Sequence, residues 1–293
     1  GLVFTAVDIS GGDVVILSST FSAVESAVQV SSGSLTVRST TFADNSAIAL
    51  PGTPPKGGGA LAARGTASVA VESSNFTRNH ASCGGAVLIE GQAKVYIEGS
   101  VFERNTATTQ GGALCVRSQL SDLTLAAQTS MVDNQAPDGD SVALITGSMR
   151  YALPAPAGRW VASAFLCAER FERCPETHPN CVPLPMDASR QPPCDYRNPR
   201  LMGRTLSRFD GSINEDYPFS CAPGLRGSSE DITTQSTSRC GGECERGYYC
   251  EAGTQVPTEC PRGYYCGLGT SSPIPCPVGT WSNRSLSVSR SAC

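Results

Sequence analysis

The chain has 293 residues, of which 16% are charged, and its formal net charge at pH 7 is −4. Because the basic residues are scattered along the chain, the composition excludes the basic surface of a nucleic-acid-binding protein. The absence of an apolar run of about 20 residues excludes a membrane-spanning helix, so we expect no direct membrane insertion.

The cysteine content indicates the compartment. The chain has 14 cysteines, and twelve of them follow residue 160. This density is typical of the secretory pathway, where disulfides stabilise modules that lack a core, so we expect an extracellular or cell-surface location. The chain opens directly in a strand-like run at 2–9 without a signal peptide. We therefore expect an internal or processed piece of a larger secreted protein.

Two short motifs alternate through residues 1–150. The first is Phe-x-x-Asn, found at 42–45, 76–79 and 102–105, with a Met variant at 131–134. The second is Gly-Gly-Ala plus an aliphatic residue, found at 58–61, 84–87 and 111–114.

These motifs recur with a period of 26 residues. Phe76 and Phe102 are 26 residues apart, and the 34 residues from Phe42 to Phe76 become 26 once an insertion of eight at 49–56 is removed. A fixed period of this size indicates stacked units that bury a core only together. Degenerate copies at Phe4 and Phe21 extend the stack to the first residues, which predicts a domain at 1–150 of roughly five or six coils.

Each unit contains three strand-like segments, one around the Phe, one after Gly-Gly and one that alternates, at 68–72, 94–98 and 122–126. Alternation places the Phe and every second aliphatic residue inward. The inward residues are Phe42, Phe76, Phe102 and Met131; Leu61, Val87 and Leu114; Ala63, Ile89 and Val116; Val69, Val95 and Leu123; Val71, Ile97 and Leu125. Three strands and three turns per unit predict an all-β parallel β-helix, in which equivalent side chains stack about 4.8 Å apart.

An asparagine column follows the Phe segments at one corner: Asn45, Asn79, Asn105 and Asn134. Asn tolerates left-handed backbone and hydrogen-bonds locally, and stacked amides can also bond to each other along the axis. We interpret the column as a structural turn ladder, with a polar ligand groove as the alternative. The paired glycines fit corners that need positive φ or close backbone approach.

Outward charges form columns along the same axis: Asp44, Arg78, Arg104 and Asp133; Arg64, Glu90 and Arg117; Arg38 and Glu72. Opposite charges on facing strands contribute roughly 0.2–1 kcal/mol, so we interpret these columns as aids to strand register. Arg78 beside Arg104 is an exception, because two like charges repel.

The alternation of Phe-x-x-Asn with Gly-Gly-Ala-aliphatic resembles the repeat of the polymorphic outer-membrane-protein family, over about residues 19–145. That family belongs to the pectin-lyase-like right-handed β-helices. The resemblance implies a right-handed parallel β-helix with an extracellular surface or adhesion role, and it implies no chemistry.

Residues 151–220 are rich in proline and contain Cys167, Cys174, Cys181 and Cys194. Proline at this density excludes long helices and central strands. We expect a disulfide-tied, mostly irregular connector that could fold back on or cap the end of the stack, with one short helix possible at 161–173.

The tail, 221–293, repeats with a 16-residue period, shown by the spacing Cys244-x5-Cys250-x9-Cys260-x5-Cys266-x9-Cys276. Each unit has Gly and an aromatic residue after its first Cys. The tail has too little apolar area to fold unaided, so bridges must stabilise it. Its pattern resembles the GCC2/GCC3, ephrin-receptor-like cysteine-rich repeat, which implies a rod or an extracellular interaction module.

Eight tail cysteines are disulfide candidates: Cys221, Cys240, Cys244, Cys250, Cys260, Cys266, Cys276 and Cys293. The x9 loops favour Cys250–Cys260 and Cys266–Cys276, while Cys221–Cys240 and Cys276–Cys293 also fit. These pairs conflict, because Cys276 is used twice and Cys244 is left over, so the connectivity stays open.

Two cysteines lie inside the repeats. Cys83 falls at a corner, and Cys115 aligns with outward Ala62 and Leu88. The two cysteines are about five residues apart laterally, which places their Cα atoms farther apart than the ~7 Å that a disulfide spans. We therefore predict that they are not bonded to each other, and that the connector covers Cys115 or bonds to it.

Sites for chemistry are few. Sequons at Asn75 and Asn283 predict glycosylation. The carboxylates Asp138 and Asp140 fit a turn better than a catalytic pair. His80 and His178 suit structural or solvated roles, and the cysteine spacing favours bridges over zinc. We therefore expect no catalytic, cofactor or metal site.

The tail aromatics, Tyr248, Tyr249, Tyr264, Tyr265 and Trp281, fit small cores of the Cys-rich units better than a ligand platform. Tyr is nonetheless favoured at interfaces.

The sequence thus predicts a non-enzymatic extracellular structural or adhesion segment of a larger protein, such as a subunit of a surface filament or ciliary appendage. Its expected partners are other extracellular proteins or copies of itself, because terminal coils expose strand edges. Two alternatives remain: a carbohydrate-binding or carbohydrate-active β-helix, and a receptor-like ectodomain that binds ligand through the tail.

Overall fold

The computed structural model describes residues 5–47, 57–151, 154–161, 213, 216–227, 234–236 and 239–293. The chain divides into a stack unit, Gly1–Ala152 with Ser163–Tyr217, and a cysteine-rich unit, Leu153–Ala162 with Pro218–Cys293. The predicted connector at 151–220 thus contributes to both units. Several predictions lie outside the described residues: Phe4, the insertion at 49–56, the helix at 161–173 beyond its first residue, His178, and Cys167, Cys174, Cys181 and Cys194.

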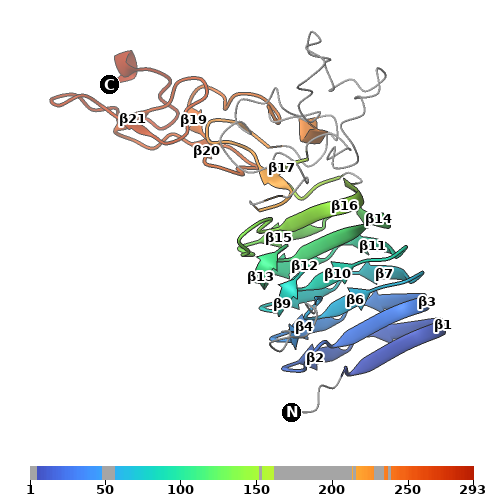
Figure 1. The fold of residues 1–293 in the computed structure, drawn as a ribbon. Coiled ribbons are helices and arrows are strands. Elements are labelled where there is room, and N and C mark those ends of the chain that lie inside the picture. The colour runs from blue at the N-terminus through green and yellow to red at the C-terminus, as the bar shows by residue number, and fades with distance from the viewer. Residues whose placement is uncertain are drawn as a thin grey trace, which may run out of the picture. The chain divides into compact units, whose positions relative to one another are not determined.

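The stack unit is all-β, and strands from successive repeats pair in parallel (Figure 1). The first sheet contains the Phe motifs in the order β15 (Ser130–Val132), β12 (Val101–Glu103), β8 (Asn75–Thr77), β4 (Thr41–Ala43) and β2 (Thr20–Ser22). The second sheet has the order β13 (Thr106–Gln110), β9 (His80–Cys83) and β5 (Ser46–Ala47). After each repeat, the chain therefore returns to the same sheet one strand further along.

The third sheet contains eight strands: β1 (Val7–Leu17), β3 (Val28–Arg38), β6 (Leu61–Ala63), β7 (Ser68–Glu72), β10 (Val87–Ile89), β11 (Lys94–Glu98), β14 (Leu114–Leu125) and β16 (Val142–Tyr151). Strand β3 pairs with both β6 and β7, and β14 pairs with both β10 and β11. These pairings close a ring of six strands. In the two middle repeats, positive-φ turns at Gly65 and Gly91 divide the strand that runs uninterrupted in β3 and β14.

The core of the stack consists of rows of equivalent side chains. Phe21, Phe42, Phe76 and Phe102 stack ring on ring, with centroids 4.5–5.1 Å apart. The inward aliphatic residues form further rows, as in the register Leu61–Val87–Leu114–Val142, and these are fully buried. Each buried side chain contributes about 1.5–3 kcal/mol, but ordering a repeat costs a comparable amount. A single repeat is therefore not expected to be stable alone.

The two ends of the stack differ. At the C-terminal end, Ile213 pairs antiparallel with Val142 and Tyr217 pairs antiparallel with Met131. The Tyr217 ring packs edge-on against Tyr151 with the centroids 5.7 Å apart. Ile213 and Tyr217 thus occupy backbone groups of Val142 and Met131 that a further parallel strand would use. At the other end, β1 pairs only with β3 among the described strands.

The cysteine-rich unit contains three short antiparallel pairs: β17 (Arg159–Trp160) with β18 (Phe219–Ser220), β19 (Tyr248–Tyr249) with β20 (Thr258–Glu259), and β21 (Tyr264–Tyr265) with β22 (Ile274–Pro275). Two 3-10 turns, Thr234–Ser236 and Arg290–Ala292, complete the described elements. The glycine after each first cysteine links successive repeats. The carbonyls of Gly224, Gly247 and Gly263 accept hydrogen bonds from the amides of Cys244, Cys260 and Cys276.

The disulfides of this unit correct one sequence prediction. The structure joins Cys221 to Cys240, Cys244 to Cys250, Cys260 to Cys266 and Cys276 to Cys293. The x9 pairs Cys250–Cys260 and Cys266–Cys276 were therefore wrong. The reason is local: the Gly-Tyr-Tyr segment turns each x5 loop back on itself, so the two cysteines that flank it meet with their Cα atoms less than 6 Å apart. This pairing leaves none of the eight cysteines over.

Candidate functional site

The corners of the stack bring together most of the polar side chains that the sequence singled out. After each strand of the first sheet, one residue adopts a left-handed backbone: Asp44, Arg78, Arg104 and Asp133 have φ between 53° and 58°. The asparagine comes next, and its side chain points inward. We predicted left-handed backbone at the asparagine itself, whereas it lies one residue earlier in the structure. That position faces solvent, so it accepts any side chain that tolerates the backbone.

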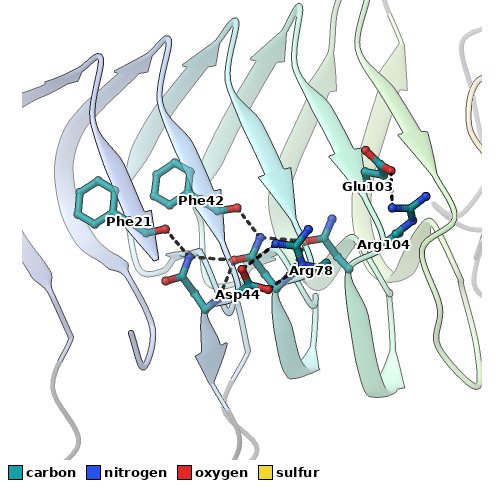
Figure 2. Close-up of polar contacts among 9 residues, drawn as sticks. Phe21, Phe42, Asp44, Arg78, Glu103 and Arg104 are labelled. Carbon is teal, nitrogen blue, oxygen red and sulfur yellow. Dashed lines mark hydrogen bonds and ion pairs between the residues drawn. The ribbon is translucent and has the colours of Figure 1, made fainter. Parts of the chain in front are cut away.

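The four asparagines form a continuous buried ladder. Asn79 Nδ2 donates to Phe42 O at 3.0 Å and to Asn105 Oδ1 at 2.9 Å. Its own Oδ1 accepts from the backbone N and the Nδ2 of Asn45. Asn105 repeats this arrangement with Phe76 and Asn134, and the first contacts of the ladder are visible in Figure 2. The asparagines are therefore occupied with coil-to-coil contacts and leave no amide exposed for a ligand groove at this corner.

A second buried ladder was missed. It precedes the strands of the first sheet and consists of Thr40, Ser74 and Ser100, each at most 1% exposed. Thr129 is buried at the equivalent position of the next repeat, and its hydroxyl donates to Ile97 O. The Ser74 hydroxyl accepts from Thr40 N at 3.1 Å and donates to Glu72 O at 2.8 Å, and Ser100 repeats this with Ser74 N and Glu98 O. The signal was present in the sequence, because a Ser or Thr stands two residues before every Phe or Met of the first sheet.

Outside the Asn ladder, the exposed charges pair along the axis. Arg78 Nε and Nη2 donate to the two carboxylate oxygens of Asp44, both at 2.8 Å (Figure 2). Hydrogen bonding from Arg78 holds the pKa of the Asp44 carboxyl below its usual range. The repulsion expected between Arg78 and Arg104 is relieved, because Arg104 turns to Glu103 at 3.3 Å and Asp133 at 3.8 Å.

A tighter charge cluster follows the second segment of each repeat. The Glu90 side chain, 24% exposed, lies between Arg64 and Arg117, and each arginine contacts a different carboxylate oxygen. Arg64 also donates to Gln29 Oε1. Burial raises the pKa of the Glu90 carboxyl, but the hydrogen bonds from both arginines outweigh burial and leave that pKa below its ordinary value. The cluster ties strands β3, β6, β10 and β14 together.

The side chains considered for chemistry make local contacts. His80 Nδ1 lies 2.6 Å from Thr106 Oγ1 in the neighbouring repeat. Asp140 Oδ1 accepts from Ala136 N, and Asp138 Oδ2 accepts from Gln110 Nε2. Within the described ranges, no group of three or more His, Cys, Asp or Glu is arranged to hold a metal ion.

Cys83 and Cys115 correct another prediction, because the structure joins them with their Cα atoms 5.8 Å apart. The predicted register holds, since Leu88 pairs with Cys115 and Ala62. The prediction assumed that about five residues separate the two cysteines laterally. It did not allow for the turn at Gly84 (φ 65°), which folds the corner over the outer face of the next strand. A Cβ on Gly84 would lie 3.1 Å from Cys115 Cβ. Cys83, Cys115, Ala62 and Leu88 thereby form a small buried cluster outside the main core.

The two sequons and the tail aromatics lie on the surface or near it. Asn75 is exposed on β8, and Asn283 is exposed in the loop closed by Cys276–Cys293. Trp281 is 65% exposed, and its indole ring lies against Gly263, where a Cβ would clash with the ring. Tyr264 is also exposed, so these two aromatics are not buried in small cores as expected.

Comparison with known proteins identifies one repeat. Residues 99–117 match the Chlamydia polymorphic membrane protein (Chlamydia_PMP) repeat. The match spans one copy of each motif, Phe102–Asn105 and Gly111–Leu114, and supports the resemblance drawn from the sequence. Searches of the curated proteins and of the solved structures found no match. No helix in the described part of the chain has the length and apolar character needed to cross a membrane.

Proposed function

We propose that this chain is a non-enzymatic structural or adhesive segment of a larger extracellular or cell-surface protein. The main support is that the repeated residues are used in building the stack: the Phe rows, the Asn ladder and the hydroxyl ladder are all buried between coils. The match of one repeat to the Chlamydia polymorphic membrane protein repeat supports this role. The disulfides of the cysteine-rich unit fit an oxidising compartment.

The finer architecture belongs to the same proposal. We take the stack to be a right-handed, pectin-lyase-like parallel β-helix, and the cysteine-rich unit to be built of GCC2/GCC3-like repeats. The recurring Gly-to-Cys hydrogen bonds favour the second assignment, because they link each repeat to the next in the same way. Partners would be other extracellular proteins or copies of this chain, including assembly into a filament.

Two measurements on the intact, oxidised chain test the proposal. Beads coated with the chain should adhere to cells or to immobilised surface proteins more strongly than beads coated with the unfolded chain. Incubation with a panel of polysaccharides should release no new reducing ends. Turnover of a polysaccharide would refute the non-enzymatic role, and glycan-dependent adhesion without turnover would favour the carbohydrate-binding alternative.

A further inference from the structure

Asn75 occupies a place that the other asparagines of the stack do not. It begins strand β8 and is exposed, while the next residue, Phe76, is fully buried in the ring stack. The side-chain amide of each of the four ladder asparagines donates hydrogen bonds to a neighbouring repeat, and these asparagines are at most 5% exposed. In the described structure, the Asn75 carboxamide makes no hydrogen bond of this kind and faces outward.

The sequon residues share one face of a short strand. Alternation along β8 puts Asn75 and Thr77 on the outer side with Phe76 between them on the inner side. Sequons are usually associated with surface loops. In strand β8 the asparagine is exposed, and among the described residues no element packs over this side of the strand.

The surroundings of Asn75 leave room for a bulky group. Its neighbours in register are Thr41 on β4 and Val101 on β12. The same row continues to Thr20 and Ser130, so every side chain in it is small and uncharged. An attached sugar would therefore meet neither a charged pair nor a long side chain along this row.

From this geometry we infer that Asn75 is an N-glycosylation site on the outer face of the first sheet. In the transfer, the Asn75 amide nitrogen forms a bond to the anomeric carbon of an oligosaccharide linked to a polyprenyl pyrophosphate. The bond from that carbon to the pyrophosphate oxygen breaks, the lipid pyrophosphate leaves, and the amide nitrogen loses one proton. No oxidation or reduction is involved. The inference does not depend on the proposed adhesive function.

The test uses the full chain secreted from eukaryotic cells. Peptide N-glycosidase converts a glycosylated asparagine to aspartate, so peptide mapping in heavy-oxygen water reads the occupancy of Asn75 and Asn283 separately. We expect the Asn75 peptide to be converted. Asn75→Gln and Thr77→Ala should each lose the Asn75 glycan, whereas Thr77→Ser should retain it.

All three substitutions lie on the exposed side of β8, so the urea midpoint of the deglycosylated variants should match that of the deglycosylated parent. An unconverted Asn75 peptide in a sample whose Asn283 peptide is converted would overturn the inference. The inference would also be overturned if neither the Asn75 peptide nor the Asn283 peptide were converted.

Discussion

At the scale of single residues, the stack depends on buried amides whose hydrogen-bonding groups are matched. Asn79 makes two donor and two acceptor contacts, which reach the repeats on both sides of its own. A buried polar group that loses its partner lowers the stability by more than the net free energy of the hydrogen bond, because water cannot replace the partner. The ladder is therefore a point where one side-chain truncation affects several coils.

Asn79→Ala should lower the free energy of unfolding of the stack by about 2–5 kcal/mol, since it removes the acceptor of Asn45 N and Nδ2 and a donor to Phe42 O. Urea unfolding followed by far-UV circular dichroism measures the change. In deglycosylated chains, Asn75→Ala is the matched control, because it removes the same side chain from the outer face of the same repeat. Equal effects of the two substitutions would show that the ladder does not stabilise the stack.

The Glu90 cluster predicts a pH dependence. The pKa of Glu90 is below its ordinary value of 4.5 in the folded chain. Its contribution to stability is thus complete above that value and is lost as pH falls through the folded-state pKa. At neutral pH, Glu90→Gln should reduce the free energy of unfolding by about 1–2 kcal/mol.

The same substitution should have little effect once the pH is low enough to protonate Glu90 in the folded chain. Denaturant unfolding of parent and variant across this range measures the difference. Glu72→Gln serves as the control, because its partner Arg38 is 55% exposed and solvent screens the pair. A Glu90 effect that persists unchanged at low pH would contradict the role of the charge.

At the scale of elements, the repeat period predicted the strands well. Aligning the copies on Phe and Gly-Gly gave the pairings Phe42–Phe76–Phe102 and Val69–Val95–Leu123 that the structure has. Period-two alternation is a property of local backbone geometry, so it can be read from one sequence. The second ladder could also have been read, since Thr40, Ser74 and Ser100 recur at the same offset.

What could not be read from the alignment is the three-dimensional path of the corners. We predicted the distance between Cys83 and Cys115 from the number of residues along an extended chain, whereas the chain turns sharply at Gly84. The same holds for the x5 loops around Tyr248 and Tyr264, which bring their cysteines together. Turn direction depends on positive-φ residues and on packing between repeats, and a residue count contains neither.

Removal of the Cys83–Cys115 bridge should destabilise the stack strongly. This bridge closes a loop with a sequence separation of 32 and joins two successive repeats. The double variant Cys83→Ala with Cys115→Ala should destabilise the stack by about 3–4 kcal/mol. Its control is the pair Cys276→Ala with Cys293→Ala, which removes a bridge of the other unit. If both double variants shift the unfolding of the stack equally, the bridge does not act locally.

At the scale of the whole molecule, two units of one chain are stabilised by different means. The stack unit has continuous buried rows and two polar ladders, with one disulfide among its described residues. The cysteine-rich unit has strands of only two residues and four disulfides in its described part. Small modules of this kind cannot bury enough apolar surface to fold without their bridges.

This contrast predicts that reduction of the disulfides unfolds the cysteine-rich unit and leaves the stack unit folded. Under mild reductant without denaturant, trypsin should cleave the cysteine-rich unit at Arg246, Arg262 and Arg284, because the loops around these residues lose their closure. Residues 57–151 should resist cleavage under the same conditions. Cys83 and Cys115 are at most 3% exposed, which shields their bridge from the reductant, and rows such as Phe76–Phe102 remain buried. Mass spectrometry of the time course identifies the fragments, and the oxidised chain is the control. Simultaneous digestion of both units would show that the stack also depends on its disulfide or on the cysteine-rich unit for its stability.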